Sequence, residues 1–337
     1  MKRLLTVLLI AGFCLLATGA FAADQAGRIT MHFDLSAQPA GQEARLWIPY
    51  PVSDANQKIT DISVTGNYAD EGVYTDQATG TPMLYARWAK DAKSRTLTFA
   101  FDVDRKEVIR RDFPAREGAW NRSDFAADLA PTSYGPTTGE VKKLADRITA
   151  GKTTVLAKAK AIYDWTCVNT YRDPKTRGCG KGDVCALLAR PGGKCADISS
   201  VFVALARAAG VPARDDFGLR QGKKSGQDIT TWYHCWAEFY LPGYGWVPVD
   251  PADVRKMMLV QHLKLDDPKT EHYRKYFWGG IDAFRVALSH GRDLNLNPRQ
   301  AAGSLNYLMY PYAEIGGAPL DWLDPTTFKY SITYQKK

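Results

Sequence analysis

A cysteine at the predicted start of an apolar helix is the residue best placed to do chemistry. Cys195 stands in GGKCADISSVFVALARAAG, residues 192–210, directly before a helix-spaced apolar face. The members of that face are Ile198, Val201, Phe202, Leu205 and Ala209. Backbone N–H groups at a helix start are unpaired, and the helix dipole stabilises an anion there. The position therefore favours a thiolate, although a cysteine taken alone is more commonly a buried structural residue.

A histidine and an aspartate further along the chain could serve this cysteine. The segment YHCWAEFYLPGYGWVPVDPAD, residues 233–253, is typical of a strand, a turn and a second strand. A pairing of His234 directly opposite Asp250 leaves a five-residue loop, which is a permitted hairpin length, and puts both side chains on one face. A carboxylate there would hold the imidazole in one tautomer. Singly, His234 is more readily a core histidine and Asp250 a turn residue before Pro251, but together with Cys195 they predict a Cys-His-Asp triad.

Three segments in this order resemble the transglutaminase-like superfamily. They are GCGKGDV at 178–184, GKCADISSVFVALARAAGVPAR at 193–214 and the hairpin at 233–253, and the resemblance spans about residues 157–254. It implies a papain-like thiol fold in which Cys195 is the nucleophile, His234 the general base and acid, and Asp250 the residue that orients the histidine. The hairpin and the tail motif WLDPTTFKYSI at 322–332 also resemble an exported bacterial branch, described as transglutaminase-like or as cysteine proteases.

The sequence departs from the cross-linking transglutaminases of animals at two places. Those enzymes typically carry Gln-Cys-Trp at the nucleophile, where this chain has Lys194-Cys195-Ala196. They also have an upstream tryptophan that helps to hold the oxyanion, and the matching stretch here, 180–183, contains none. The Cys195 backbone N–H is then the remaining oxyanion donor. No calcium-loop pattern is present, so neither a metal nor another cofactor is expected.

These residue types predict thiol-dependent acyl transfer at amide bonds. Attack by Cys195 would give an acyl-thioester, which water or an amine could resolve. We expect a cysteine peptidase or amidase acting on a peptide or protein, with cell-wall peptides suggested by compartment alone. One alternative is a protein-glutamine transglutaminase, and another is a non-enzymatic binding or scaffold protein that has kept the fold.

Four further cysteines remain after the predicted leader: Cys167, Cys179, Cys185 and Cys235. Their number is even and allows three pairings, and free buried thiols are the other interpretation. Their spacing does not suit a zinc site. Exported sequences that this chain resembles carry both the GCG loop and the His-Cys pair, and this resemblance favours a Cys179–Cys235 disulfide. Cys167 and Cys185 would then form a second pair or stay as thiols.

The N-terminus has the pattern of a secretory signal peptide, residues 1–22. A basic start is followed by a short apolar run and the small-residue site Ala20-Phe21-Ala22. An uncleaved anchor is disfavoured because the run is short for a membrane span. We therefore expect an exported protein, periplasmic or secreted, with no stable membrane insertion after cleavage. The formal net charge of +8 is spread along the chain without a Lys/Arg block, so no nucleic-acid partner is expected.

The elements that would position the triad form an α+β protein. Period-two apolar stripes, such as Ile29 to Leu35 and Leu97 to Val103, predict an antiparallel β-sandwich over residues 23–116. Helix-spaced patterns at 141–148 and 154–166 precede the Cys195 helix, and together with the hairpin they predict a papain-like catalytic core at 130–255. We assign residues 256–337 to a C-terminal extension of the catalytic domain that ends in a strand.

Overall fold

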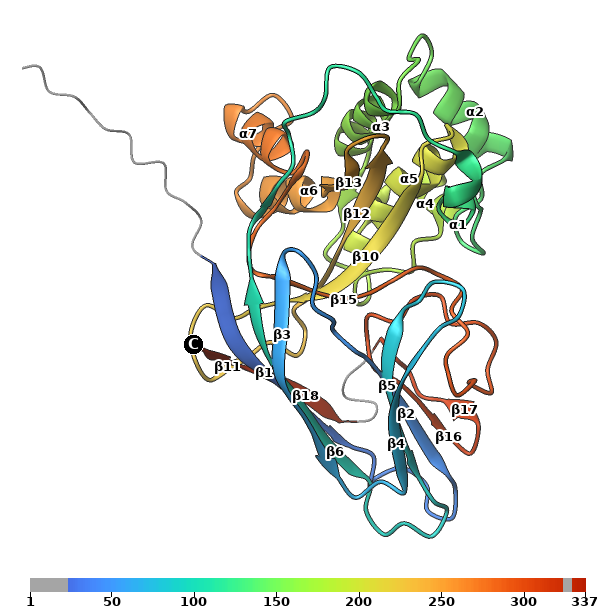
Figure 1. The fold of residues 1–337 in the computed structure, drawn as a ribbon, viewed down its shortest axis with the longest axis vertical. Helices are drawn as coiled ribbons and strands as arrows, with labels where there is room; N and C mark the ends of the chain where they lie inside the picture. Colours follow the sequence, from blue (N-terminus) through green and yellow to red (C-terminus); the bar gives the residue numbers. More distant parts are fainter. Residues whose placement is uncertain (1–23, 324–328) are drawn as a thin grey trace, which may run out of the picture.

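The chain folds into two lobes, which Figure 1 shows one above the other, with most helices in the upper lobe and the long strands of the sandwich in the lower. This computed structural model describes residues 24–323 and 329–337. The predicted signal peptide, residues 1–22, lies outside the described residues. Within them, every helix is too short or too polar to cross a membrane.

Alternating apolar residues build the lower lobe as two antiparallel sheets that share one core. The strand orders are β11-β18-β1-β6-β3 and β17-β16-β2-β5-β4. The strands are β1 (Gln25–Asp34), β2 (Ala44–Pro49), β3 (Gln57–Gly66), β4 (Asp70–Thr75), β5 (Pro82–Trp88), β6 (Thr96–Arg105), β11 (Gln227–Asp228), β16 (Tyr312–Ile315), β17 (Ala318–Pro319) and β18 (Tyr330–Lys336). The stripes predicted on β1 and β6 are buried between the sheets, which confirms the N-terminal antiparallel sandwich.

The C-terminal segment is divided between the two lobes. The sequence analysis assigns residues 256–337 to the catalytic domain, and this is wrong for the strands from β16 onward. Strand β16 pairs with β2, and β18 pairs with β1 from Phe33↔Tyr330 to Gly27↔Lys336. Strand β18 alternates buried and exposed residues, so it can extend the sheet at the free edge of β1 with its apolar side chains in the shared core. The chain between the two strands forms the upper lobe and then returns to this edge. A sequence pattern shows that a strand exists but not which edge it joins.

The upper lobe is a sheet of order β13-β12-β10-β15 with helices packed on it. Its strands are β10 (Ala213–Arg220), β12 (Tyr233–Leu241), β13 (Gly245–Val249) and β15 (Arg285–His290). Its helices are α1 (Ala126–Leu129), α2 (Gly139–Ile148), α3 (Val155–Asn169), α4 (Val184–Ala189), α5 (Cys195–Ala208), α6 (Pro251–Val260) and α7 (Pro268–Tyr276), after the 3-10 turn η1 (Arg122–Phe125). Short strands complete it: β7 (Val108–Ile109), β8 (Tyr171–Arg172), β9 (Gly192–Gly193) and β14 (Gly280–Ile281).

Helix α5 runs through the centre of this lobe. Its predicted apolar face is buried from Ile198 to Leu205, whereas Ala209, the C-cap, is half-buried; the alanines and serines within the helix are buried too. The helix packs on β10 and β12 and also contacts α2, α3, α4 and α6. Small side chains on the remaining faces let these neighbours approach closely. The helix that starts with Cys195 is therefore held from all sides.

The hairpin that carries His234 and Asp250 has a different register from the predicted one. Leu241 pairs with Gly245, so the loop has three residues, 242–244, in place of five. Asp250 then follows β13 and lies diagonally from His234, because the register places Ala237 opposite Val249. The shift amounts to two residues, and an even shift keeps both side chains on the same face.

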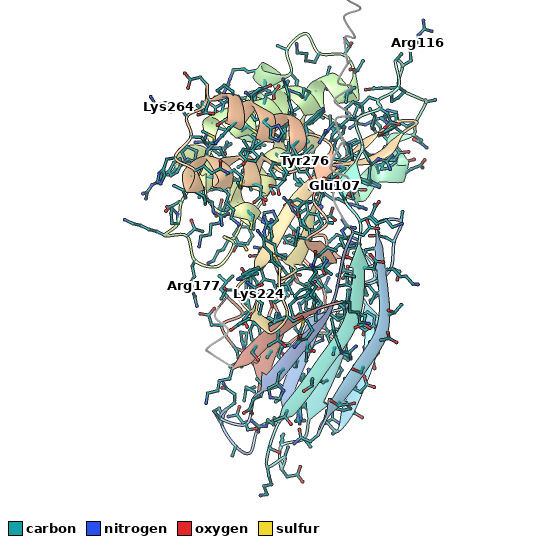
Figure 2. The ribbon with its side chains drawn as sticks, turned by 90° about the vertical axis from the view of Figure 1, so that its left-hand side faces the viewer. Glu107, Arg116, Arg177, Lys224, Lys264 and Tyr276 are labelled. Atoms are coloured by element: carbon teal, nitrogen blue, oxygen red, sulfur yellow. The ribbon has the colours of Figure 1, made fainter. Side chains whose placement is uncertain are left out.

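Side chains bridge the two lobes where they meet. The Tyr276 hydroxyl donates to Glu107 at 2.5 Å, and Figure 2 shows both residues at this junction. Gln57 on β3 makes two hydrogen bonds with the backbone of Ala287 on β15, at 2.8 and 3.0 Å. The sandwich is thereby fixed against the sheet that carries the histidine.

Candidate active site

Cys195 is the first residue of α5 and is 1 % exposed. The amide of the following residue, Ala196, donates to Cys179 O at 2.9 Å, which holds the helix start against the preceding loop. Among the described residues, the Cys195 N–H has no recorded protein acceptor. A free N–H beside the sulfur is suited to bind the oxyanion of a tetrahedral intermediate.

Asp197 ties the glycine-rich loop at 178–184 to the start of α5. Its Oδ2 accepts from Lys194 N at 3.1 Å, and its Oδ1 accepts from Gly182 N at 2.8 Å. A Cβ on Gly180, which has φ +91°, would lie 1.9 Å from the Asp197 carboxylate. Only glycine fits there, because both the backbone conformation and the space exclude a side chain. The loop is therefore shaped to pack on the nucleophile helix.

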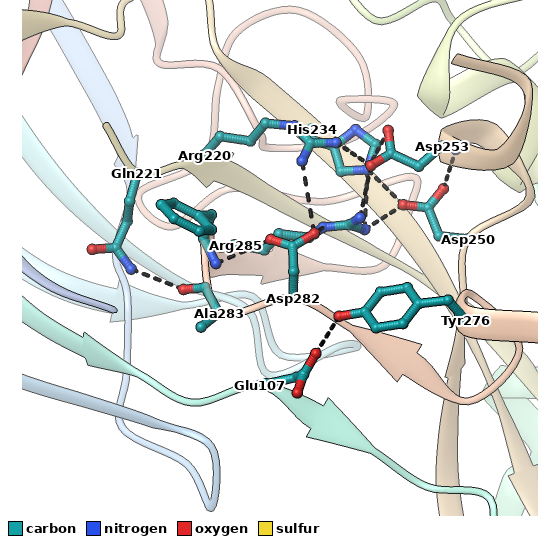
Figure 3. A network of polar contacts seen from close by, with 11 residues as sticks. Glu107, Arg220, Gln221, His234, Asp250, Asp253, Tyr276, Asp282, Ala283 and Arg285 are labelled. Atoms are coloured by element: carbon teal, nitrogen blue, oxygen red, sulfur yellow. Dashed lines mark hydrogen bonds and ion pairs between the residues drawn. The ribbon is translucent and has the colours of Figure 1, made fainter. Parts of the chain in front are cut away.

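His234 and Asp250 are brought together as the sequence predicts. His234 Nε2 lies 2.7 Å from Asp250 Oδ2, and both residues are buried. Asp250 is also the N-cap of α6, where its Oδ1 accepts from Asp253 N at 2.7 Å. Because a carboxylate accepts, Nε2 carries the proton and Nδ1 is left to accept from a thiol. His234 is one of the groups that lower the pKa of Cys195. Figure 3 shows the His234–Asp250 contact from close by.

A buried arginine that the sequence analysis missed stands against this pair. Arg285 on β15 is completely buried and contacts Asp250 Oδ2 through Nη1. Its Nη2 lies 2.7 Å from Asp253 Oδ2 and its Nε 3.0 Å from Asp282 Oδ2, and Figure 3 shows it between these carboxylates. No motif surrounds Arg285 in the sequence. Its role depends on the pairing of β15 with β10, which brings it beside residues from distant segments.

The charged groups of this network are paired with one another. Burial alone would lower the pKa of Arg285, but the carboxylates of Asp282, Asp250 and Asp253 raise it above its ordinary value. Burial alone would raise the pKa of Asp253, but Arg220, His234 and Arg285 hold it well below its usual range. Arg220 Nη2 lies 2.5 Å from Asp253 Oδ2. Buried charges persist only where they are paired in this way.

One group of potential metal ligands occurs in the described residues, and it coincides with this network. Ligand atoms of His234, Asp250 and Asp253 all lie within 4.8 Å of one another. Two guanidinium groups already contact these carboxylates, so a cation would have to displace Arg285 or Arg220. The donor set fits an arginine-bound carboxylate network better than a metal centre.

Two further thiols act on the pKa of Cys195. They belong to Cys179 and Cys235, which lie in the same buried cluster as Cys195. Burial alone would raise the pKa of Cys195, but these two thiols and His234 hold it well below its ordinary value. The pKa values of Cys179 and Cys235 are raised well above theirs, by the hydrogen bond to Cys195 and by burial. The three groups together favour a thiolate on Cys195 alone.

The expected disulfide is not formed. All five cysteines in the described residues are free thiols, so the predicted Cys179–Cys235 pairing is wrong for this structure. Strand alternation places Cys235 on the opposite face of β12 from His234. Its side chain does point away from His234, but that direction leads to α5 and its first residue, Cys195. The fallback pair fares no better, since Cys167 is buried in α3 and Cys185 is exposed on α4.

Known proteins agree with this arrangement. The sequence model of the transglutaminase-like superfamily matches residues 142–251, which include Cys195, His234 and Asp250. An uncharacterized protein of Haemophilus influenzae is 37% identical over 334 residues, covering 91% of this chain and 90% of that protein. The chain belongs to the transglutaminase-like superfamily. Because that relative matches nearly from end to end, it shares with this transglutaminase-like chain both the sandwich and the catalytic lobe.

One solved structure shares the fold of this chain over most of its length. A candidate cysteine protease from Cytophaga hutchinsonii has a TM-score of 0.54 at 17% identity, covering 93% of this chain and 98% of that one. The periplasmic domain of TgpA from Pseudomonas aeruginosa has a TM-score of 0.35 at 17% identity, covering 68% of this chain and 90% of that one. The Cytophaga protein thus shares the two-lobed fold.

Proposed function

We propose that this protein is a cysteine peptidase or amidase that acts through an acyl-thioester on Cys195. The observation that carries the proposal is the 2.7 Å contact between His234 Nε2 and Asp250 Oδ2, which leaves Nδ1 of the imidazole for the thiol. The lowered pKa of Cys195, set against burial by its contacts with Cys179, Cys235 and His234, supports the same assignment. Lone structural cysteines lack such partners.

The mechanism uses only residues of this chain. The Cys195 thiolate attacks the amide carbonyl carbon, and the developing oxyanion is bound by the Cys195 N–H. The imidazolium of His234 then gives its proton to the leaving amine as the C–N bond breaks, which leaves a thioester. His234 next removes a proton from water, the hydroxide attacks the thioester, and the thiolate is released with the acid product. Asp250 keeps the ring oriented throughout.

The substrate class follows from the chemistry and from the predicted leader. A thiolate paired with histidine attacks amides, so we propose a peptide or protein substrate. The predicted leader, residues 1–22, implies export to the periplasm or outside the cell. An exported protein would meet cell-wall peptides, which we propose as one substrate class.

Transamidation is the second candidate, and one observation favours it. Cys195 is 1 % and His234 3 % exposed, so little water reaches the thioester in this conformation. An amine could compete with water only where water is excluded in this way. Hydrolysis remains the first choice because the chain lacks the Gln-Cys-Trp motif and the upstream tryptophan typical of cross-linking enzymes.

A product analysis separates these activities. Quenched peptide libraries are incubated with the wild-type protein, with and without a primary amine, and the products are identified by mass spectrometry. Hydrolysis leaves a free acid, whereas transamidation joins the added amine to the acyl group. Cys195→Ala should abolish either reaction, while Cys185→Ala, at an exposed thiol, should leave it unchanged. If Cys195→Ala retains turnover, the proposal is wrong; a reactive Cys195 without turnover of any peptide would favour the binding or scaffold alternative.

A further inference from the structure

A cavity of about 550 Å³ lies between the sandwich and the sheet that carries His234. Its volume is in the range that small organic ligands occupy. It is lined on the sandwich side by Arg105 at the end of β6 and on the sheet side by residues of β10, β12 and β13. The sheet residues that matter below are Arg214, Asp216, Trp236, Glu238 and Trp246. Trp236 is two residues from His234 on the same face of β12, yet His234 and Cys195 do not line the cavity.

Arg105 is the unusual group in this wall. It continues the inward-facing stripe Leu97, Phe99, Phe101 and Val103 of β6, so a guanidinium stands where the pattern calls for an apolar residue. It is 4 % exposed and its Nε has no hydrogen-bond partner. Its recorded ion pair is with Asp54, at 3.8 Å from Nη1. A buried guanidinium normally has carboxylate or carbonyl partners at hydrogen-bond distance, because an unpaired charge is costly to bury.

The other arginines of the cavity are already engaged. Arg214 Nη2 lies 2.7 Å from Glu238 Oε2, and its guanidinium carbon stacks 4.1 Å from the ring centroid of Trp246. Arg110 Nη2 donates to Tyr244 O at 2.6 Å. Arg110 Nε is also without a partner, but Arg105 differs from both arginines because its side chain makes no hydrogen bond to a described residue.

The charge of the cavity favours a singly charged anion. Three arginines, at 105, 110 and 214, face three carboxyl groups, at 54, 216 and 238. Burial and the neighbouring Glu238 raise the pKa of Asp216 well above its ordinary value, which favours its neutral form. A raised pKa at Asp216 makes the wall less negative than the count of carboxyl groups suggests. A dianion would meet the charges of Asp54 and Glu238, which disfavour it more than a monoanion.

Part of the remaining lining is apolar or aromatic. Trp236 packs with Val108 and Ile281 in one small cluster, and all three face the cavity, as does Trp246. Such surfaces hold the body of a ligand while one polar group fixes its orientation.

We propose that this cavity binds a small organic monoanion, a carboxylate attached to an apolar group, with the carboxylate on Arg105. The ligand would sit beside the catalytic centre without touching Cys195. The proposal concerns binding and does not depend on the acyl-transfer chemistry.

Titration with hippurate, an aromatic carboxylate, tests the proposal. Binding to the full chain is followed by calorimetry and by the fluorescence of Trp236 and Trp246. We expect saturable binding of hippurate, no binding of its neutral amide hippuramide, and weaker binding of phenyl phosphate at a pH where it is a dianion. Arg105→Gln should weaken hippurate binding by about tenfold or more, since hydrogen bonds to charged groups are lost.

The control is Arg28→Gln. Arg28 lies on β1 of the same sheet, is part-exposed and binds Asp102 at 3.0 Å, so its loss should leave hippurate binding unchanged. The comparison of hippurate with hippuramide uses wild-type protein and stands even if Arg105→Gln does not fold. The proposal is overturned if hippurate does not bind, if hippuramide or phenyl phosphate binds as well as hippurate, or if a folded Arg105→Gln variant binds hippurate as the wild type does.

Discussion

Asp250 binds His234 with one carboxylate oxygen and caps helix α6 with the other. Oδ2 lies 2.7 Å from His234 Nε2, and Oδ1 accepts from Asp253 N at 2.7 Å. The two interpretations of this residue open to sequence analysis, triad member and turn residue before Pro251, are therefore not exclusive. Anchoring to a helix start fixes the carboxylate that orients the imidazole, so the helix and the triad depend on one side chain.

Substitution of Asp250 by Asn should separate these two roles. Asn is as good an N-cap as Asp, so α6 should persist, but the tautomer of His234 would no longer be fixed. We expect turnover to fall by about 10²-fold or more, with a folded protein by circular dichroism. Loss of the charge opposite Arg285 should also lower the melting temperature.

The matched control is Asp267→Asn. Asp267 also precedes a proline and caps its helix, α7, by accepting from Lys269 N at 2.8 Å. Unlike Asp250, it is not among the hydrogen-bond or ion-pair partners of His234. Turnover of this variant should equal that of the wild type. Wild-type turnover in Asp250→Asn would show that Asp250 serves only as a cap.

The reactivity of Cys195 should persist at mildly acidic pH. A lowered pKa keeps the sulfur as thiolate below the range in which ordinary thiols are protonated, so its alkylation rate should stay level as the pH falls and drop only near its own pKa. An unperturbed thiol instead slows about tenfold per pH unit below roughly 8.5. Iodoacetamide labelling with peptide mapping measures this, in a Cys185→Ser background that removes the exposed thiol.

Replacement of His234 by Ala supplies the comparison for this experiment. It removes one of the groups that lower the pKa of Cys195, so the labelling rate should become steeply pH-dependent in the neutral range. If Cys195 in the wild type already reacts like an ordinary thiol, or Cys179 or Cys235 reacts first, the assignment of the nucleophile fails.

Loss of Arg285 should be far more damaging than loss of a partly exposed arginine. Arg285→Ala leaves Asp250, Asp253 and Asp282 without their shared partner, and uncompensated buried charges cost about 3–5 kcal/mol. Arg274, with Asp164 at 3.0 Å and Glu271 at 3.3 Å near the surface, is the control, and Arg274→Ala should cost about 1 kcal/mol or less. Urea unfolding of both variants provides the free energies, and equal values would contradict the role given to Arg285.

A pair of glycine variants tests the fit of the loop against α5. Gly180→Ala adds a methyl group onto the Asp197 carboxylate at a positive φ, whereas Gly226→Ala meets the same kind of strain at φ +74° with no atom within 4 Å. We expect the backbone strain to lower the free energy of unfolding by about 1–2 kcal/mol in both variants, and the overlap at Gly180 to lower it by about 1–3 kcal/mol more. Gly180→Ala should lower the melting temperature and change the labelling rate of Cys195. Gly226→Ala should lower the melting temperature only by the amount due to backbone strain and leave the labelling rate unchanged.

The three residues of the proposed triad could be selected from the sequence because each lies at a local signal. Cys195 begins an apolar helix, and His234 and Asp250 flank a short turn, so spacing and face alternation were enough. The predicted register was off by two residues, yet parity alone decides which face a side chain takes. The partners of the triad could not be predicted in this way. Arg285 lies 35 residues after Asp250 in the sequence and is brought to it by the pairing of β15 with β10. No sequence pattern marks it.

The thiol cluster shows a different limit. Counting cysteines in an exported protein favours pairs, and Cys235 does point away from His234 as strand alternation requires. The count contains no information on what lies on the other side of the strand, which is the start of α5. Three-dimensional packing thus converts a supposed structural pair into neighbours of the nucleophile.

The pairing of β18 with β1 has a consequence for the order in which the protein can fold. Strand β1 is among the first described residues to leave the ribosome and β18 is the last, and their partners are separated by about 300 residues. Until β18 is available, β1 has β6 on one side and an open edge on the other, and such an edge can pair with other chains. The catalytic lobe lies between these two strands in sequence and can form earlier from local helices. We therefore expect the nucleophile helix to be assembled before the sheet that begins the chain is closed.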